Sequence, residues 1–146
     1  MAFSRHVSHT HHFVYSRCAG IVDDNDLRIH VLGFQVDTRG LPFVRELLDF
    51  RYLQKADKLT LQGIIEISQL ERQRSSDRDF LLAIVADQPL FYQMARIYAL
   101  VIRTKNLKVK VFKDASVAAA LTWLGYQGSD HAQLVDFIDR HAQQPT

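Results

Sequence analysis

The sequence has little of what small extracellular or membrane proteins usually contain. Its one cysteine, Cys18, cannot form an intrachain disulfide, which is consistent with a reducing compartment. The first residues lack the apolar core of a signal peptide. No apolar run approaches the roughly 18 residues that a membrane-spanning helix needs, and the richest, residues 97–102, ends at Arg103. We therefore expect a cytoplasmic protein without a membrane span.

An excess of charge of one sign is also missing. Eighteen basic residues are balanced by sixteen acidic ones, which gives a formal net charge of +2. A duplex-binding surface requires clustered Lys and Arg side chains that neutralise successive phosphates. Only residues 103–110 are locally basic, and there Lys108 and Lys110 alternate with apolar residues as they do on a strand. We therefore expect no nucleic acid among the partners.

The size and composition are those of one ordinary globular domain over residues 1–146. The chain is 47% hydrophobic and 23% charged, far from the composition of disordered proteins. No repeat or linker is visible, and the three prolines and six glycines separate short segments. We expect residues 1–10 to be either flexible or an added edge strand, and residues 127–146 to contain a C-terminal helix.

Four segments have the composition of β-strands. Residues 12–20 mix aromatic and β-branched side chains, and residues 44–52 and 107–112 alternate or run apolar. The continuous apolar run of residues 80–87 is the clearest strand, and it predicts burial on both faces, as in the middle of a mainly parallel sheet.

Helices are predicted after these strands. Asp23 and Asp24 can cap a helix that has Leu27, Val31 and Phe34 on one face, although the alternation of residues 27, 29 and 31 also permits a strand. The other predicted helices are one capped by Thr60, one from Pro89 to about Thr104, one over residues 115–124 that is capped by Asp114 and ended by Gly125, and one over residues 130–141. This alternation predicts an α/β domain of βα units, with a four- to five-stranded, mainly parallel sheet.

The helix that begins at Pro89 has a wide apolar surface. Its apolar arc spans about 160°, beyond the roughly 100° that a helix packed on a sheet needs. Tyr92, Arg96 and Arg103 lie on its polar side. The surplus apolar surface can face a well-filled core, a dimer partner or an apolar ligand, and the sequence leaves these alternatives open.

Several fragments, taken together in this order, resemble bacterial STAS-like proteins, which are SpoIIAA-like or anti-sigma-factor-antagonist-like. The fragments are Ala83–Asp87, Met94–Tyr98, Val109–Asp114 and Ala119–Gly125, preceded by residues 19–26 and 46–50. The resemblance covers about residues 10–126. It implies a layered α/β domain that is related in fold to the lipid-binding CRAL-TRIO domains.

One departure from this group concerns its phosphorylation switch. Partner-switching members carry a serine or threonine just after the aspartate that matches Asp49, at the start of the next helix. Here no serine follows, and Thr60 is eleven residues further on. The resemblance thus implies a non-catalytic regulatory or protein-interaction module without the phosphorylatable residue, as a homodimer or with a regulatory protein partner. The alternative is a binding protein for a lipid or another apolar small molecule.

Two aspartates stand where ligands of open α/β sheets usually bind. Asp49 and Asp87 are at the predicted carboxyl ends of strands. Alternatively, each caps the next helix or pairs with an arginine such as Arg51. The residues that we predict to contact a partner or ligand are Asp49, Arg51, Tyr52, Asp87, Tyr92, Met94 and Arg96.

Catalytic and metal-binding patterns are not expected. His6, His9, His11 and His12 invite a metal site, but a closed site needs three or four ligands in fixed geometry, so we expect a solvated terminus instead. Cys18 is expected to be buried rather than nucleophilic. The chain has no GxGxxG, GxxxxGK[ST] or GxSxG motif. We therefore predict no enzyme, no cofactor and no metal.

Overall fold

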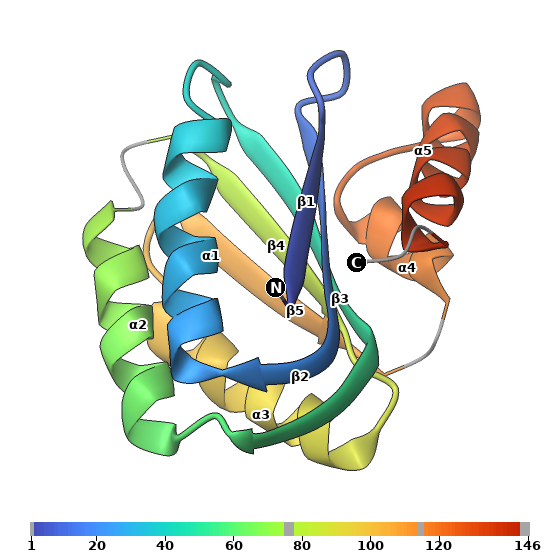
Figure 1. The fold of residues 1–146 in the computed structure, drawn as a ribbon. Coiled ribbons are helices and arrows are strands. Elements are labelled where there is room, and N and C mark those ends of the chain that lie inside the picture. The colour runs from blue at the N-terminus through green and yellow to red at the C-terminus, as the bar shows by residue number, and fades with distance from the viewer. Residues whose placement is uncertain (1, 75–77, 114–115, 144–146) are drawn as a thin grey trace.

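The computed structural model describes residues 2–74, 78–113 and 116–143, and it contains one five-stranded sheet (Figure 1). The strands lie in chain order across the sheet: β1 (Phe3–Ser8), β2 (Phe13–Asp23), β3 (Val44–Lys58), β4 (Phe80–Val85) and β5 (Leu107–Phe112). β1 is antiparallel to β2, and the other pairs are parallel. The predicted fold class is therefore confirmed, and of the two expectations for residues 1–10 the edge strand is the one observed.

Helices cover both faces of this sheet. α1 (Asp24–Asp37), α2 (Leu61–Arg74) and α3 (Pro89–Ile102) cross between neighbouring parallel strands, and right-handed crossovers taken in this order place them on one face. α4 (Val117–Trp123) and α5 (Gly128–Ala142) cover the other face, as Figure 1 shows. No helix in the described ranges is long and apolar enough to cross a membrane.

Alternate side chains of each strand contribute to the two cores. On the face of α1, α2 and α3, the strand residues Val14, Leu48 and Ile84 pack against helix residues that include Leu27, Ile64 and Ala95. On the face of α4 and α5, Phe13, Leu47 and Ala83 pack against Leu121, Leu134 and Ile138. β4 lies inside the sheet, between β3 and β5, and is buried on both faces, as its apolar run predicts.

Polar residues at the predicted positions begin two helices. Asp23 is the N-cap of α1: its carboxylate accepts a hydrogen bond of 2.8 Å from the Asp26 N–H, and the Asp26 carboxylate accepts one of 3.1 Å from the Asp23 N–H. This capping box favours the helix over the alternative strand. At α2, the Thr60 hydroxyl oxygen accepts from the Gly63 N–H at 2.9 Å.

The structure corrects several predicted boundaries. β3 does not end at Tyr52 but continues to Lys58, because its polar second half pairs with the end of β2 across irregular registers. α4 begins at Val117 with Ser116 as its N-cap; the predicted cap, Asp114, lies outside the described residues together with Ala115. Gly125 has φ +99° just after α4, as a glycine that ends a helix should.

Candidate functional site

Asp49 lies within β3 and is fully buried beside Arg51 and Tyr15. Its Oδ2 accepts hydrogen bonds from the Tyr15 hydroxyl at 2.6 Å and from Arg51 Nη2 at 2.8 Å. Its Oδ1 accepts from the Arg51 backbone N–H at 3.0 Å and from Arg51 Nε at 2.9 Å. Burial, followed by the charge of Asp49, raises the pKa of the Tyr15 phenol. The predicted pairing of Asp49 with Arg51 is confirmed, and both carboxylate oxygens serve internal bonds.

Tyr52 follows this ion pair at the rim of the sheet. Its ring lies 4.6 Å from the Arg17 guanidinium carbon and 5.4 Å from that of Arg51, both of which are cation–π distances. The side chain is 37% exposed. Asp49, Arg51 and Tyr52 therefore form one cluster, of which Tyr52 is the part most open to solvent.

The other predicted binding residues lie in different places. Asp87 is exposed in the loop before α3, where Gln88 rather than Asp87 is the N-cap, so the predicted cap is wrong. Tyr92 and Arg96 lie on one flank of α3, with the Arg96 guanidinium carbon 5.9 Å from the Tyr92 ring. Met94 is half-buried and lines an apolar hollow. The structure thus divides the predicted residues among separate surfaces instead of joining them in one site.

The apolar hollow lies between the helices of the three-helix face and the end of β3. Its lining includes Phe3, Leu27, Phe50, Phe91 and Met94, and its volume is about 30 Å³. Ligand pockets generally measure hundreds of cubic ångströms, whereas this volume holds about one water-sized sphere. In this conformation the hollow is too small for an acyl chain.

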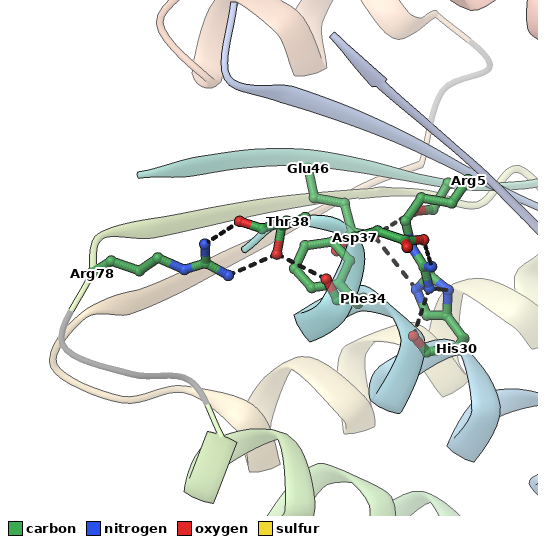
Figure 2. A network of polar contacts seen from close by, with 8 residues as sticks. Arg5, His30, Phe34, Asp37, Thr38, Glu46 and Arg78 are labelled. Carbon is green, nitrogen blue, oxygen red and sulfur yellow. Dashed lines mark hydrogen bonds and ion pairs between the residues drawn. The ribbon is translucent and has the colours of Figure 1, made fainter. Parts of the chain in front are cut away.

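A buried polar network that sequence reasoning missed connects β1 to α1 (Figure 2). The Arg5 guanidinium donates to the Asp37 carboxylate at 2.6 Å and to the His30 carbonyl oxygen at 2.6 Å. It also contacts His30 Nδ1 at 2.9 Å, and because arginine only donates, this nitrogen must be the acceptor. The ring proton of neutral His30 is then on Nε2, which lies 3.5 Å from the Glu46 carboxylate.

The same network continues into the interior of the three-helix face. Glu46, which is 2% exposed, accepts a hydrogen bond of 2.5 Å from the Ser16 hydroxyl. Further along this face, Glu71 of α2 accepts a hydrogen bond from the Tyr98 hydroxyl of α3. Burial raises the pKa of Glu71 to about 7, although the bond from Tyr98 opposes this shift.

Two sequence signals could have revealed this network. His30 lies three residues after Leu27 and four before Phe34, so it shares the apolar stripe of α1. Glu46 lies in β3, and most of the residues next to it in the strand are apolar. Since both ring nitrogens of His30 are engaged, the network supplies internal structure rather than a free base or metal ligand.

A second part of the network fixes the end of α1 (Figure 2). Arg78, just before β4, donates to the Thr38 carbonyl oxygen at 2.7 Å and to the Thr38 hydroxyl oxygen at 2.8 Å. That hydroxyl in turn donates to the Phe34 carbonyl oxygen at 2.8 Å. The last turn of α1 is thereby tied to the start of β4.

Three of the four histidines near the N-terminus contact other parts of the chain, whereas His9 is exposed, so the expected solvated terminus holds only for His9. His6, on β1, stacks with His141 at 3.9 Å between ring centroids. His11 Nε2 lies 3.4 Å from the Asp130 carboxylate, and His12 meets the Phe43 ring edge-on. Among the described residues, no group of three or more His, Cys, Asp or Glu side chains could hold a metal ion.

Cys18 is fully buried, as predicted. It belongs to a small apolar cluster with Val22, Leu53 and Phe91. Burial raises the pKa of its thiol, which keeps the group protonated and unreactive at neutral pH.

Four large aliphatic side chains are exposed on α2 and α3. On α2, Leu61 and Ile65 are 58% and 36% exposed; they lie on the flank away from Gly63, which is the residue that approaches α1 at Asp24. On α3, Leu90 and Ile97 are 65% and 39% exposed; they lie on the flank away from Tyr92 and Arg103. α2 and α3 pack against each other. We call these four aliphatic side chains the α2–α3 seam.

Comparison with known proteins bears on the fold. The crystal structure of an uncharacterized protein of the DUF3478 family, from Shewanella loihica PV-4 and described as having a SpoIIAA-like fold, superposes with a TM-score of 0.55. The match covers 84% of this chain and 92% of the other, at 20% identity. This chain has a SpoIIAA-like fold. The structure therefore confirms, at the level of fold, the resemblance that the sequence fragments indicate. No protein-family model and no curated protein matches the sequence.

Proposed function

We propose that this chain with a SpoIIAA-like fold is a protein-interaction module that works by docking rather than by catalysis. The α2–α3 seam carries the proposal, because four large aliphatic side chains that are 36–65% exposed lie on two adjoining helices. We propose that they form one exposed apolar patch, and such patches are typical of association sites. The sequence prediction of surplus apolar surface on the α3 helix is consistent with this use.

A second copy of the chain is the simplest partner for the seam. Two-fold association places the same side chains of each protomer against one another, so a self-complementary apolar surface is sufficient. A regulatory protein that presents an apolar helix would use the same side chains. Both partners belong to the same proposal, since each buries the seam.

The environment of the candidate catalytic groups supports a role without chemistry. The carboxylate of Asp49 and the ring nitrogens of His30 serve internal contacts, and the Cys18 thiol is buried. The residues directly after Asp49 continue β3 instead of starting a helix. We therefore propose that a phosphate at that position does not regulate this chain.

Binding of a lipid or another apolar small molecule is the second candidate function. Its support is the wholly apolar lining of the hollow beside Phe91 and Met94. We rank it lower, because a volume of about 30 Å³ requires the helices to separate before a chain-like ligand enters. If native mass spectrometry detected a bound small molecule, this second function would be favoured over protein interaction.

Substitution of one seam residue tests the main proposal. Ile97→Asp places a charge within the seam and should convert a dimer into a monomer, or abolish capture of a partner. Ile29→Asp on α1 is the matched control, because Ile29 is 41% exposed against 39% for Ile97 and lies outside the seam. Light scattering at increasing protein concentration measures the mass, and affinity capture measures the partner. A monomer at all concentrations, together with partner capture that Ile97→Asp does not weaken, would refute the proposal.

A further inference from the structure

The outer edge of β5 is unpaired within the described part of the chain. The backbone groups of the even-numbered residues in and around β5 point toward β4. The hydrogen bonds from the Phe80 N–H to the Asn106 oxygen and from the Ala86 N–H to the Phe112 oxygen show this pattern. The backbone groups of residues 107, 109 and 111 therefore point outward. Such an edge is a template for a further strand.

Only the first part of this edge is occupied. The Leu107 N–H donates to the Thr104 hydroxyl at 3.1 Å, and the Leu107 oxygen accepts from the Thr104 N–H at 3.2 Å. Arg103 Nη2 reaches the Val109 oxygen at 3.4 Å. In the part of the chain that the structure describes, the Val109 N–H and both backbone groups of Val111 have no hydrogen-bond partner.

The surroundings of this edge are strongly basic. Between residues 88 and 113 the sequence has six basic residues and no acidic one: Arg96, Arg103, Lys105, Lys108, Lys110 and Lys113. All six are exposed. None of them forms an ion pair with a described residue. The balanced charge of the whole chain therefore conceals a local cationic surface.

A groove between α3 and β5 runs beside the same edge. It has a volume of about 430 Å³, and its lining includes Tyr92, Arg96, Leu100, Arg103 and Lys110. Leu100 is 70% exposed. The groove thus combines an aromatic ring, an aliphatic side chain and cations next to unpaired backbone groups.

We propose that the outer edge of β5 binds an extended acidic segment of a partner protein as a sixth strand of the sheet. Backbone hydrogen bonds to Val109 and Val111 would align the segment. Carboxylates on alternate residues would meet Lys108 and Lys110 on one face of the sheet, and the side chains between them would lie along the groove at Arg96 and Arg103. This edge is distinct from the α2–α3 seam, so the two surfaces are independent.

The same observations argue against other occupants. A second copy that paired antiparallel through β5 would bring lysines of the two strands together, and like charges opposite each other destabilise a sheet. A small anion needs donors that converge on one point, whereas these cations extend from α3 along the strand. Lysines on an edge strand also protect it against pairing with neutral strands. Such protection does not require Arg96 and Arg103, which lie beside the edge in the groove.

Peptide binding tests the proposal on the full chain. The probe is a fluorescein-labelled peptide of about ten residues that alternates Glu and Thr; the control peptide has Lys in place of Glu. Fluorescence anisotropy should show saturable binding of the acidic peptide only. Amide spectra should show the Val109 and Val111 N–H signals shifting on binding.

Two variants separate charge from backbone pairing. Lys108→Glu with Lys110→Glu should weaken binding by roughly tenfold or more, while the matched pair Lys55→Glu with Lys58→Glu, two exposed lysines of β3, should not. Val111→Pro removes an outward donor without removing a ladder bond to β4, and should also weaken binding by roughly tenfold.

A change in the peptide gives the same information if Val111→Pro fails to fold. Two versions of the acidic peptide are made, one N-methylated on its odd-numbered residues and one on its even-numbered residues. The version whose methyl groups replace the N–H donors that face β5 should lose binding. If both versions bind like the parent, or if an unstructured oligonucleotide of equal charge binds as tightly, the site is a general polyanion surface and the proposal is wrong. A dimer lost in the double lysine variant would also overturn it, because a second copy would then occupy the edge.

Discussion

The two faces of the sheet bury different kinds of side chain. Of the seven buried polar or charged residues in the described part of the chain, six lie on the face of α1, α2 and α3: Ser16, His30, Thr38, Glu46, Ser68 and Glu71. The seventh, Asp49, lies on the face of α4 and α5, beside a core built from aromatic and aliphatic residues. One sheet therefore has a hydrogen-bonded interior on one side and an apolar interior on the other.

This difference shows what holds each layer in place. On the three-helix face, directional bonds fix β1 against α1 and α2 against α3, because a buried polar group that lost its partner would be costly. On the two-helix face, shape and apolar area determine the position of α4 and α5. Removing one group should therefore have different consequences on the two faces.

The largest effect is expected from the single polar residue of the apolar face. Asp49→Ala removes the carboxylate that accepts hydrogen bonds from the Arg51 guanidinium and the Tyr15 hydroxyl, and should lower the free energy of unfolding by about 4 kcal/mol. Asp87→Ala removes an exposed aspartate in the loop after β4 and should change it by less than about 0.5 kcal/mol. Urea denaturation compares the two, and equal effects would mean that the buried pair contributes nothing.

A somewhat smaller effect is expected from the packing of the same face. Leu121 of α4 is fully buried, so Leu121→Ala should lower the free energy of unfolding by about 3 kcal/mol through lost apolar contact and a cavity. Leu100→Ala, at a residue that is 70% exposed, is the control. If the two variants unfold at the same urea concentration, α4 is not packed as described.

The smallest effect depends on pH and belongs to the three-helix face. The pKa of Glu71 is raised from 4.5 to about 7, so the folded state binds this proton more tightly than the unfolded state does. The unfolding free energy should therefore fall as the pH rises from about 4.5 to 7, by roughly 2–3 kcal/mol, and change little above that. Glu71→Gln should remove this slope, and Glu66→Gln, an exposed position on the same helix, should retain it. Denaturant titrations across this pH range measure both, and identical slopes would contradict the assignment.

The sequence was sufficient to predict most of the fold because local signals agreed with tertiary burial. The apolar run of residues 80–87 marked an interior strand, β4, and Asp23, Thr60 and Pro89 marked three helix starts. The second half of β3 was missed because residues 53–58 are mostly polar and become a strand only by pairing with β2. Its formation depends on a contact that no local pattern encodes.

The candidate site was predicted less well for the same reason. The pairing of Asp49 with Arg51 was accessible because the residues are two positions apart. The link from Arg5 to His30 joins residues 25 positions apart, and the seam depends on which flank of each helix faces its neighbour. Such relations follow from the assembled layers, and single-segment periodicity does not contain them.

The strand order has a consequence for synthesis on the ribosome. Since the strands lie across the sheet in the order in which they are made, each new βα unit adds to an existing edge, and none must insert between two others. α4 and α5 follow the whole sheet in the chain, so the side of the nascent sheet that carries Phe13, Leu47 and Ala83 stays uncovered until they emerge. During that interval the growing polypeptide exposes an apolar surface, so we expect chaperones to bind it at a late stage of translation.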